Sequence, residues 1–295
     1  MRASERTVPS MLKTFTKTPH LKPVTKWVGG KRQLLKELTA LLPAEYNRYF
    51  EPFVGGGALL FDLAPQTAVI NDLNPELMNL YQVIKDTPDQ LIACLEQHQL
   101  HNSKDYYLEL RSADRDGRID QFSMVERAAR FVYMLKVDFN GIYRVNSKGQ
   151  FNVPYGRYVH PKIADRENII TVHQFFKEQQ ITLLNSDFAT ACETATAHDL
   201  VYFDPPYIPL TETANFTSYT KDGFGMADQL RLRDLFFDLK QRGVQVMLSN
   251  SDTPVTRKLY QSATIHTVSA SRAINSVGSK RGKVGEVIIT SYDHS

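Results

Sequence analysis

The segment Asp204-Pro205-Pro206-Tyr207 carries the residue types in this sequence that are best suited to chemistry. It follows an apolar run, Leu200–Phe203, which predicts a buried strand. Ligands of open α/β sheets bind beyond the carboxyl ends of the strands, so this segment should lie at the ligand-binding edge. Prolines lack N–H groups and fix φ, which predicts a rigid turn with outward carbonyl groups. Asp204 and the Pro205 carbonyl would then be neighbouring acceptors, and Tyr207 a stacking surface.

These groups suit an exocyclic amine on a planar base, because two acceptors can bind both N–H groups while the aromatic ring stacks on the base. Such stacking contributes about 1–3 kcal/mol per base. A buried strand with a proline-rich exit and no ligand is the structural alternative. The sequence has no His-x-Glu paired with Cys-x-x-Cys, so zinc-dependent deamination of the base is not supported. The absence of a Pro-Cys dipeptide argues against a cysteine nucleophile of the kind that attacks cytosine during methylation at C5.

A glycine turn near residue 55 is the second motif. The run 49–53 predicts a strand, which ends in Gly55-Gly56-Gly57 and leads into a helix. The next predicted strand, 67–71, ends at Asp72, where a carboxylate can accept hydrogen bonds from ribose hydroxyls. The third glycine that a dinucleotide fingerprint requires is missing, so the pattern favours an adenosine-type ligand or a purely structural turn.

The third motif, residues 26–31, superficially resembles a phosphate-binding loop. The spacing fails, because Thr25 stands where the first glycine is required and Arg32 where a serine or threonine is required. Trp27, the single tryptophan of the chain, lies here between Lys26 and Lys31, and a core anchor is its structural alternative.

Composition restricts the class of protein. The chain has 295 residues, 42% of them hydrophobic and 23% charged, with a formal net charge of +3. This length favours two domains or one large domain with an insertion. No apolar run reaches the roughly 20 residues that a membrane span needs. Two cysteines, Cys94 and Cys192, exclude a disulfide scaffold and a four-cysteine metal site. An intracellular, soluble enzyme without a metal is the expectation.

Basic residues gather in three stretches. Residues 1–36 hold nine Lys or Arg and one acidic residue. Residues 136–162 hold five basic residues and one acidic residue, and residues 257–283 hold six basic residues and no acidic residue. They are either separate solvated surfaces or one surface that follows a phosphate backbone.

The order of elements predicts an α/β domain that is interrupted once. Residues 1–20 read as a basic mobile tail, 21–85 and 181–295 as a catalytic α/β domain, and 86–180 as a mostly helical insertion with a β-hairpin around residues 146–149. The predicted strands are 49–53, 67–71, 181–184, 200–203, 244–248 and 287–290; the predicted helices are 31–42, 58–63, 75–85, 124–136 and 228–241.

The motifs together resemble the amino-group DNA methyltransferases. Residues 204–207 match their Asp-Pro-Pro-Tyr motif, and 53–57 are similar to their Phe-x-Gly-x-Gly motif. The order of the two, with an insertion between them, resembles the α class of adenine-N6 enzymes. Further segments are similar to Dam-type enzymes, which methylate adenine in GATC: residues 26–31, 140–144, 149–157 and 214–219. The resemblance covers residues 21–292 and leaves out the tail.

The resemblance implies a Rossmann-like, mixed-sheet S-adenosylmethionine-dependent methyltransferase domain, with residues 86–180 as an inserted target-recognition domain. It implies that Asp204, Pro205, Pro206 and Tyr207 form the catalytic segment and hold an extruded adenine. The residues implied to bind S-adenosylmethionine are Trp27, Lys31, Phe53, Gly55, Gly57, Asp72 and Asp204.

The resemblance also implies a DNA-binding set: Lys26, Phe139, Asn140, Ile142, Arg144, Asn146, Pro154 and Arg157. Lys26 would approach the first guanine of the site, and Arg144 would read the guanine paired with the last cytosine. Arginine is the commonest reader of guanine in the major groove, although a phosphate contact is the alternative for Arg144. Phe139 and Asn140 would fill the gap left by the extruded base; related enzymes often have tyrosine at position 139.

The expected activity is therefore methyl transfer from S-adenosylmethionine to N6 of adenine in double-stranded DNA, most simply in GATC. The alternatives are an amino-group methyltransferase acting on RNA or protein, and an inactive DNA-binding regulator on the same scaffold. A cytoplasmic, DNA-associated enzyme of a bacterial or phage-infected cell is expected, with a cognate restriction endonuclease as a conceivable partner and no membrane.

Overall fold

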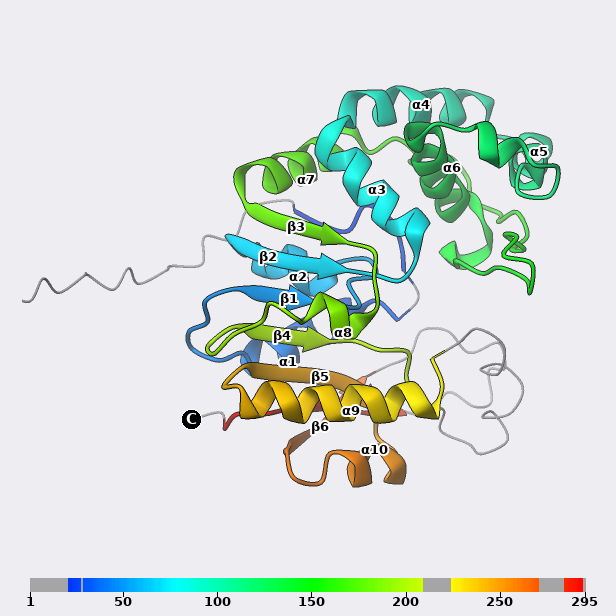
Figure 1. The fold of residues 1–295 in the computed structure, drawn as a ribbon. Helices are drawn as coiled ribbons and strands as arrows, with labels where there is room; N and C mark the ends of the chain where they lie inside the picture. Colours follow the sequence, from blue (N-terminus) through cyan, green and yellow to red (C-terminus); the bar gives the residue numbers. More distant parts are fainter. Residues whose placement is uncertain (1–20, 28, 209–223, 271–283, 294–295) are drawn as a thin grey trace, which may run out of the picture.

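A seven-stranded mixed sheet forms the centre of the molecule (Figure 1). The computed structural model describes residues 21–27, 29–208, 224–270 and 284–293. The strand order is β3-β2-β1-β4-β5-β7-β6, and β7 runs antiparallel to both of its neighbours while the strands from β3 to β5 are parallel. The strands are β1 (Tyr49–Glu51), β2 (Thr67–Asn71), β3 (Gln180–Leu184), β4 (Leu200–Phe203), β5 (Gln245–Ser251), β6 (Thr264–Ala270) and β7 (Val284–Thr290).

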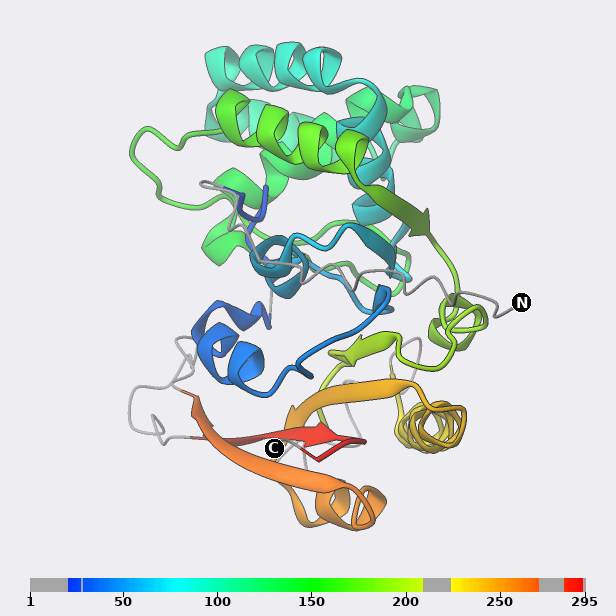
Figure 2. The ribbon, with the colours of Figure 1, turned by 90° about the vertical axis from the view of Figure 1, so that its left-hand side faces the viewer.

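The central strands are largely buried and mostly apolar ahead of their carboxyl ends, because helices cover both faces of the sheet. Tyr49 and Tyr202 point into one core with α1 (Leu35–Ala40) and α2 (Ala58–Leu63). Their neighbours Phe50 and Phe203 point into the other core, with α8 (Phe188–Ala191) and α9 (Met226–Gln241). Figure 2 shows α9 on one side of the sheet and the blue helices α1 and α2 on the other. A short helix, α10 (Pro254–Leu259), follows β5.

A group of helices stands beyond β3 at one end of the sheet (Figure 1). Its members are α3 (Pro75–Asp86), α4 (Pro88–His101), α5 (Lys104–Ser112), α6 (Met124–Val137) and α7 (Arg166–Glu178). α6 begins at a capping box formed by Ser123 and Glu126, and most of its residues are buried. Its Arg127 forms an ion pair with Glu76 of α3. This pair joins α6 to α3, the member of the group that directly follows β2. No helix within the described residues is long and apolar enough to cross a bilayer.

The strand–turn–helix–strand unit predicted around residues 49–71 is confirmed as β1-α2-β2, with the two strands parallel. Three local predictions were wrong. The helix expected over 31–42 is a 3-10 turn, Lys31–Gln33, followed by the shorter α1, with non-helical backbone angles at Leu34 between them. The strand expected over 49–53 ends at Glu51, because Pro52 has no N–H group to donate to a neighbour. The sequence reading also missed β6.

The β-hairpin expected around residues 146–149 is present in reduced form. Its arms join through two isolated bridges, Asp138 with Tyr155 and Val145 with Phe151, instead of a continuous ladder. Asn146 N–H donates to the Gln150 carbonyl at 2.9 Å and closes the turn. The segment follows α6 on the side to which the arrowheads of the parallel strands point in Figure 1.

The start of β4 is fixed to β1 by a buried carboxylate, Asp199. Its Oδ1 accepts from the Arg48 backbone N–H at 3.0 Å, and its Oδ2 accepts from the Arg48 guanidinium at 2.6 Å and from the Thr196 N–H at 2.8 Å. Asp199 is completely buried, whereas the Arg48 side chain is one-third exposed. This network sets where β4 begins, and hence where its carboxyl end delivers Asp204.

Asp199→Ala should lower the free energy of unfolding by about 2–4 kcal/mol, because several buried donors lose their acceptor. Urea denaturation followed by far-ultraviolet circular dichroism measures this change. Asp238→Ala is the matched control. It removes an α9 carboxylate that pairs with Arg242 at the surface, and it should change stability by less than about 0.5 kcal/mol. Equal effects of the two substitutions would contradict the assigned role of Asp199.

Candidate active site

The Asp-Pro-Pro-Tyr segment leaves β4 at the carboxyl edge of the sheet, as the sequence predicted. Lys31 Nζ lies 2.7 Å from Asp204 Oδ1, with the lysine side chain 8% and the aspartate side chain 19% exposed. The same ammonium group donates to the Gly29 carbonyl at 2.8 Å and lies 4.5 Å from the centre of the Tyr207 ring. A nearly buried cation thus joins the 26–31 motif to the Asp-Pro-Pro-Tyr segment.

Side chains from α9 and β5 hold this segment in place. Gln229 Nε2 donates to the Pro206 carbonyl at 2.9 Å, and Asn250 Oδ1 accepts from the Ile208 N–H at 3.1 Å. Gln229 and Asn250 are also within hydrogen-bonding distance of each other, at 3.4 Å. Both are buried, so the turn is held by satisfied polar groups in addition to its two prolines.

Glu286 is a site residue that the sequence reading missed. It lies on β7, is 6% exposed, and accepts a hydrogen bond from the Tyr207 hydroxyl at 3.1 Å. Because β7 runs antiparallel, its beginning lies beside the ends of the parallel strands. In the sequence, Glu286 stands out only as an acidic residue in an otherwise mostly apolar strand. Asn250 stands out in the same way, within the polar run Ser249-Asn250-Ser251 at the end of β5.

Carboxyl groups concentrate at this edge. Burial raises the pKa of Asp204; the Lys31 ammonium opposes that rise and Glu286 adds to it. Burial also raises the pKa of Glu51, at the end of β1, well above its usual range, with contributions from Asp204 and Asp72. Acidic groups that raise one another's pKa mark a region that favours a positively charged ligand.

The glycine turn forms a close-fitting surface beside Asp72. Gly55 and Gly57 have φ values of +48° and +69°, which favour glycine. A Cβ on Gly55 would come within 2.7 Å of Trp27 Cδ1, so the turn admits no side chain there. Asp72 Oδ2 accepts from the Gly55 N–H at 3.0 Å and Oδ1 from the Asn74 N–H at 2.9 Å. Trp27, Gly55 and Asp72, three members of the predicted cofactor set, therefore come together.

Phe53 has a more structural position than the other members of the cofactor set. Its ring packs against Phe188 and Phe224, each at 5.5 Å between centroids, and lies edge-on to Phe203. It forms the apolar wall between the glycine turn and the α8–α9 face of the sheet.

Most of the predicted DNA-binding residues lie on or next to the hairpin that follows α6, whereas Lys26 belongs to the 26–31 motif. Phe139 is 54% exposed, and Arg144, Pro154 and Arg157 are also exposed. Arg144 Nε donates to Asn152 Oδ1 at 2.7 Å, which fixes the direction of its guanidinium group.

Two asparagines shape the backbone of the hairpin. Asn146 Oδ1 accepts from the N–H groups of Lys148 and Gln150, at 2.9 and 3.0 Å, so Asn146 stabilises the turn itself. Asn140 has a φ of +67°, a left-handed conformation that asparagine tolerates better than most residues. The Phe139 N–H donates to the Pro154 carbonyl at 2.9 Å, which joins the arms beside Asn140.

A buried carboxyl group, Asp138, supports the exposed end of the hairpin. Its Oδ1 accepts from the Ile142 N–H at 3.2 Å, while Oδ2 has no hydrogen-bond partner. Burial raises its pKa to about 7, although hydrogen bonds from the backbone and the nearby Lys26 oppose that rise. The carboxyl group thus bridges the residues on either side of Phe139–Gly141.

Lysines from two of the three basic stretches meet next to the hairpin. Lys26 lies 5.2 Å from the centre of the Tyr158 ring. Burial lowers the pKa of Lys136, Asp165 opposes this change, and the positive charges of Lys22, Lys26 and Lys162 add to it. Asp165 also forms ion pairs with Lys22, at 3.3 Å, and with Lys162, at 2.7 Å. Lysines of the first and second stretches therefore lie close together, around one carboxylate. Most of the third stretch, residues 271–283, lies outside the described residues, as do the tail 1–20 and the 214–219 motif.

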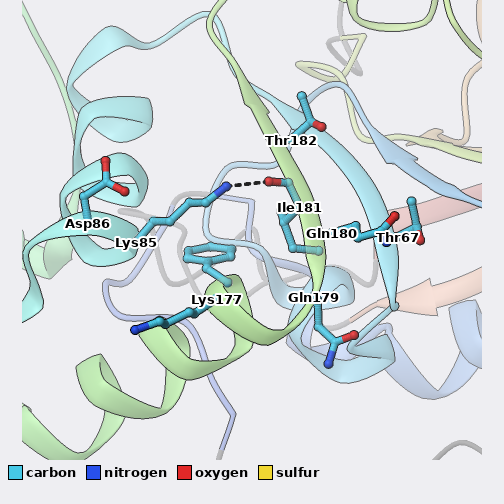
Figure 3. A pocket seen from close by; sticks show the side chains of 9 residues that line it. Thr67, Lys85, Asp86, Lys177, Gln179, Gln180, Ile181 and Thr182 are labelled. Carbon is cyan, nitrogen blue, oxygen red and sulfur yellow. Dashed lines mark hydrogen bonds between the residues drawn. The ribbon is translucent and has the colours of Figure 1, made fainter.

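A separate hollow lies at the opposite edge of the sheet, where β2 and β3 begin (Figure 3). Its lining includes Lys85, whose Nζ donates to the Ile181 carbonyl at 2.8 Å, together with Thr67 and Lys177. None of the predicted site residues lines it. Among the described residues, no group of at least three His, Cys, Asp or Glu side chains is arranged to hold a metal ion.

Comparison with known proteins decides the family. The family model of D12 class N6 adenine-specific DNA methyltransferases matches residues 27–274. This chain belongs to that family. The methyltransferase is 58% identical to the type II methyltransferase M1.LlaDCHI of Lactococcus lactis subsp. cremoris over 273 residues, 92% of this chain and 96% of the relative. It is 34% identical to the DNA adenine methylase of Escherichia coli over 265 residues, 89% of this chain and 92% of that protein.

The family confirms the resemblance, the fold class and the enzyme class that the sequence predicted. The Asp-Pro-Pro-Tyr segment, the glycine turn and the hairpin all fall within the matched residues. A relative at 41% identity over 290 residues is the type II methyltransferase M.MjaIII of Methanocaldococcus jannaschii, covering 92% of this chain and 99% of the relative. The methyltransferase thus has relatives named as type II enzymes and relatives named as DNA adenine methylases.

Asp138→Asn should gain stability relative to the wild type as the pH rises from 4 to 8. The pKa of Asp138 in the folded protein, about 7, lies above its ordinary value of 3.8, so ionisation opposes folding. This cost is absent below pH 3.8, grows as the pH rises, and is complete above pH 7. Because one pKa unit corresponds to about 1.4 kcal/mol, the expected relative gain is on the order of 4 kcal/mol. Urea denaturation at both pH values measures it, with Asp238→Asn as the control.

A difference between wild type and Asp138→Asn that stays constant with pH would contradict the raised pKa. A difference that moves in the opposite direction would mean that Asp138 is ionised and stabilising in the folded protein.

Proposed function

We propose that this methyltransferase transfers a methyl group from S-adenosylmethionine to N6 of an adenine extruded from double-stranded DNA, within GATC. The observation that carries the proposal is the Lys31–Asp204 pair against Tyr207, beside the glycine turn at the carboxyl edge of the sheet. This arrangement joins a base-stacking ring, hydrogen-bond acceptors and a ligand-binding turn in one place.

The residues present fit the proposed donor. Asp72 offers carboxylate oxygens at the end of β2 for ribose hydroxyls, and the turn at Gly55 lets a ligand approach the backbone. In addition to Asp204, the buried Lys31 ammonium can pair with the carboxylate of S-adenosylmethionine. The acidic groups at this edge of the sheet favour its positively charged sulfonium group. When bound, S-adenosylmethionine supplies an electrophilic methyl group.

The role of Asp204 follows from its pairing. Lys31 bonds to Oδ1, so the other carboxylate oxygen can accept an N–H of the adenine amine. Together with the Pro205 carbonyl, it would draw the amine hydrogens out of the ring plane and localise the nitrogen lone pair. Asp204 need not be a strong base, since the amine proton becomes acidic only after the methyl transfer. Positioning and fixed charges then account for most of the acceleration.

Tyr207 holds the base by its face. The hydrogen bond from its hydroxyl to Glu286 fixes the orientation of the ring. Stacking on this ring offsets part of the few kcal/mol that extrusion of the base costs.

Residues 86–180 serve as the target-recognition domain in this proposal. The lysines beside the hairpin would contact phosphates, and Arg144 would read a guanine of the site. Phe139, exposed at the end of the hairpin, would fill the place of the extruded adenine together with Asn140. Ile142 and Pro154 would contact neighbouring bases, and Lys26 the first guanine.

A type II relationship supports a restriction endonuclease of the same specificity as a partner, because two relatives carry that name. The proposed location is the cytoplasm, in contact with DNA.

Asp204→Ala should lower methyl transfer by at least about a thousandfold, because acceptors that act only in the transition state contribute several kcal/mol. Binding of the DNA duplex should stay within about threefold, since the hairpin and lysines are unchanged. Incorporation of radiolabelled methyl groups and electrophoretic mobility shift measure the two properties. Asp238→Ala serves as the control. Unimpaired transfer by Asp204→Ala would refute the assignment.

Arg144→Ala should relax the preference for one base pair of the site by about 1–3 kcal/mol, or roughly five- to 150-fold. Lys148→Ala, a change to an exposed lysine on the same hairpin, should weaken binding uniformly on all sequences if it contacts phosphate. Methylation rates on duplexes that differ by one base pair measure both effects. Equal losses on cognate and mismatched duplexes would make Arg144 a phosphate contact.

A further inference from the structure

The aromatic ring of Tyr143 connects the hairpin to the glycine turn. Tyr143 stands between Ile142 and Arg144 and stacks on Trp27, with 5.8 Å between ring centroids and 19° between planes. Neither the Asp-Pro-Pro-Tyr chemistry nor the proposed base contacts uses Tyr143. Its position is nevertheless the point where the proposed reader of DNA touches the proposed binding site of the methyl donor.

Trp27 packs closely against the glycine turn. A Cβ placed on Gly55 would be 2.7 Å from Trp27 Cδ1, and one on Gly56 would be 3.0 Å from Trp27 Cβ. The indole therefore lies in close contact with the turn on one side and with Tyr143 on the other. Tyr143, Trp27 and the glycine turn thus form a continuous series of contacts, along which a shift of the Tyr143 ring would reach the turn.

A second contact leads from Tyr143 to the acidic side of the same turn. The side chain of Asn74 lies near the Tyr143 hydroxyl, where it opposes the rise that burial causes in the pKa of that group. Asn74 N–H also donates to Asp72 Oδ1 at 2.9 Å, and the Asn74 side chain caps α3. Tyr143 is thus linked to both groups that flank the proposed adenosine site, Gly55 through Trp27 and Asp72 through Asn74.

The hairpin side of Tyr143 is equally well fixed. Its ring lies 5.4 Å from that of Phe131 on α6 and 5.9 Å from that of Phe151 on the opposite arm of the hairpin. Movement of the hairpin against DNA must therefore move Tyr143 or break this packing.

We propose that Tyr143 is a positioning residue that couples binding of the DNA site to binding of the methyl donor. The inference rests on the proposed function and adds a specific route between the two binding sites. Correct seating of the hairpin on DNA places Tyr143 against Trp27 and Asn74, and these hold the turn and Asp72 for the donor. Because such coupling is reciprocal, a bound donor also tightens binding of the DNA.

The test measures the dissociation constant of S-adenosylhomocysteine by calorimetry, with and without a duplex containing GATC, using the full chain. The wild type should bind it at least about fivefold more tightly with the duplex present, within the range of ordinary allosteric coupling. Tyr143→Leu should bring this ratio to within about twofold of one. Tyr143→Phe retains the stacking and should keep most of the ratio. Val145→Ala, an exposed change on the same hairpin, should keep all of it.

Trp27 provides a second readout, because it is the single tryptophan of the chain. Addition of the duplex to the wild type, with no cofactor present, should change the tryptophan emission, and this change should be lost in Tyr143→Leu. Both wild-type measurements test the inference even if the leucine variant does not fold.

A wild-type ratio of one would overturn the inference, as would a Tyr143→Leu variant that folds and keeps the wild-type ratio. Failure of the wild type to bind S-adenosylhomocysteine at all, or to bind the duplex, would instead refute the proposed function. The two failures are therefore distinguishable.

Discussion

The ion pair between Lys31 and Asp204 is the interaction on which the arrangement of the site depends. Transfer of either charge alone from water into this largely buried place would be strongly unfavourable, so each requires the other. The pair also connects two segments that are far apart in the sequence, the 26–31 motif and the Asp-Pro-Pro-Tyr segment. The neighbouring Tyr207 ring shields it on one side.

The topology of the sheet explains why the acidic groups converge. Glu51, Asp72 and Asp204 come at or just after the carboxyl ends of β1, β2 and β4, which are adjacent parallel strands. Glu286 arrives from the beginning of β7, because this strand alone is reversed. Parallel strands therefore supply the proposed ligand-binding groups, and the antiparallel strand supplies the group that orients the stacking ring.

Much of the α/β fold and part of the candidate site could be predicted from the sequence, because strong local patterns mark the strands and turns. Two patterns predicted that the candidate site residues lie at the carboxyl edge of the sheet. One is the apolar strand that ends in Asp-Pro-Pro-Tyr, and the other is the glycine turn followed by Asp72. Glu286 and Asn250 stand out locally only as polar residues in or after apolar runs, and no local pattern states which strand will be reversed or which residue it brings to the edge. The stacking of Trp27 on Tyr143 was equally hidden, because it joins residues more than a hundred positions apart. The break in the helix at Leu34 lies beside Lys31, which is buried and ion-paired with Asp204, a long-range contact that local helix propensity does not include.

Sequencing of modified adenines in DNA from cells that lack other adenine methylation and express this chain tests the central claim most directly. The account predicts N6-methyladenine in GATC and its loss when Asp204→Ala is expressed in place of the wild type. Methylated adenine at unrelated sequences, or unmodified DNA in cells that contain the folded wild-type protein, would contradict it.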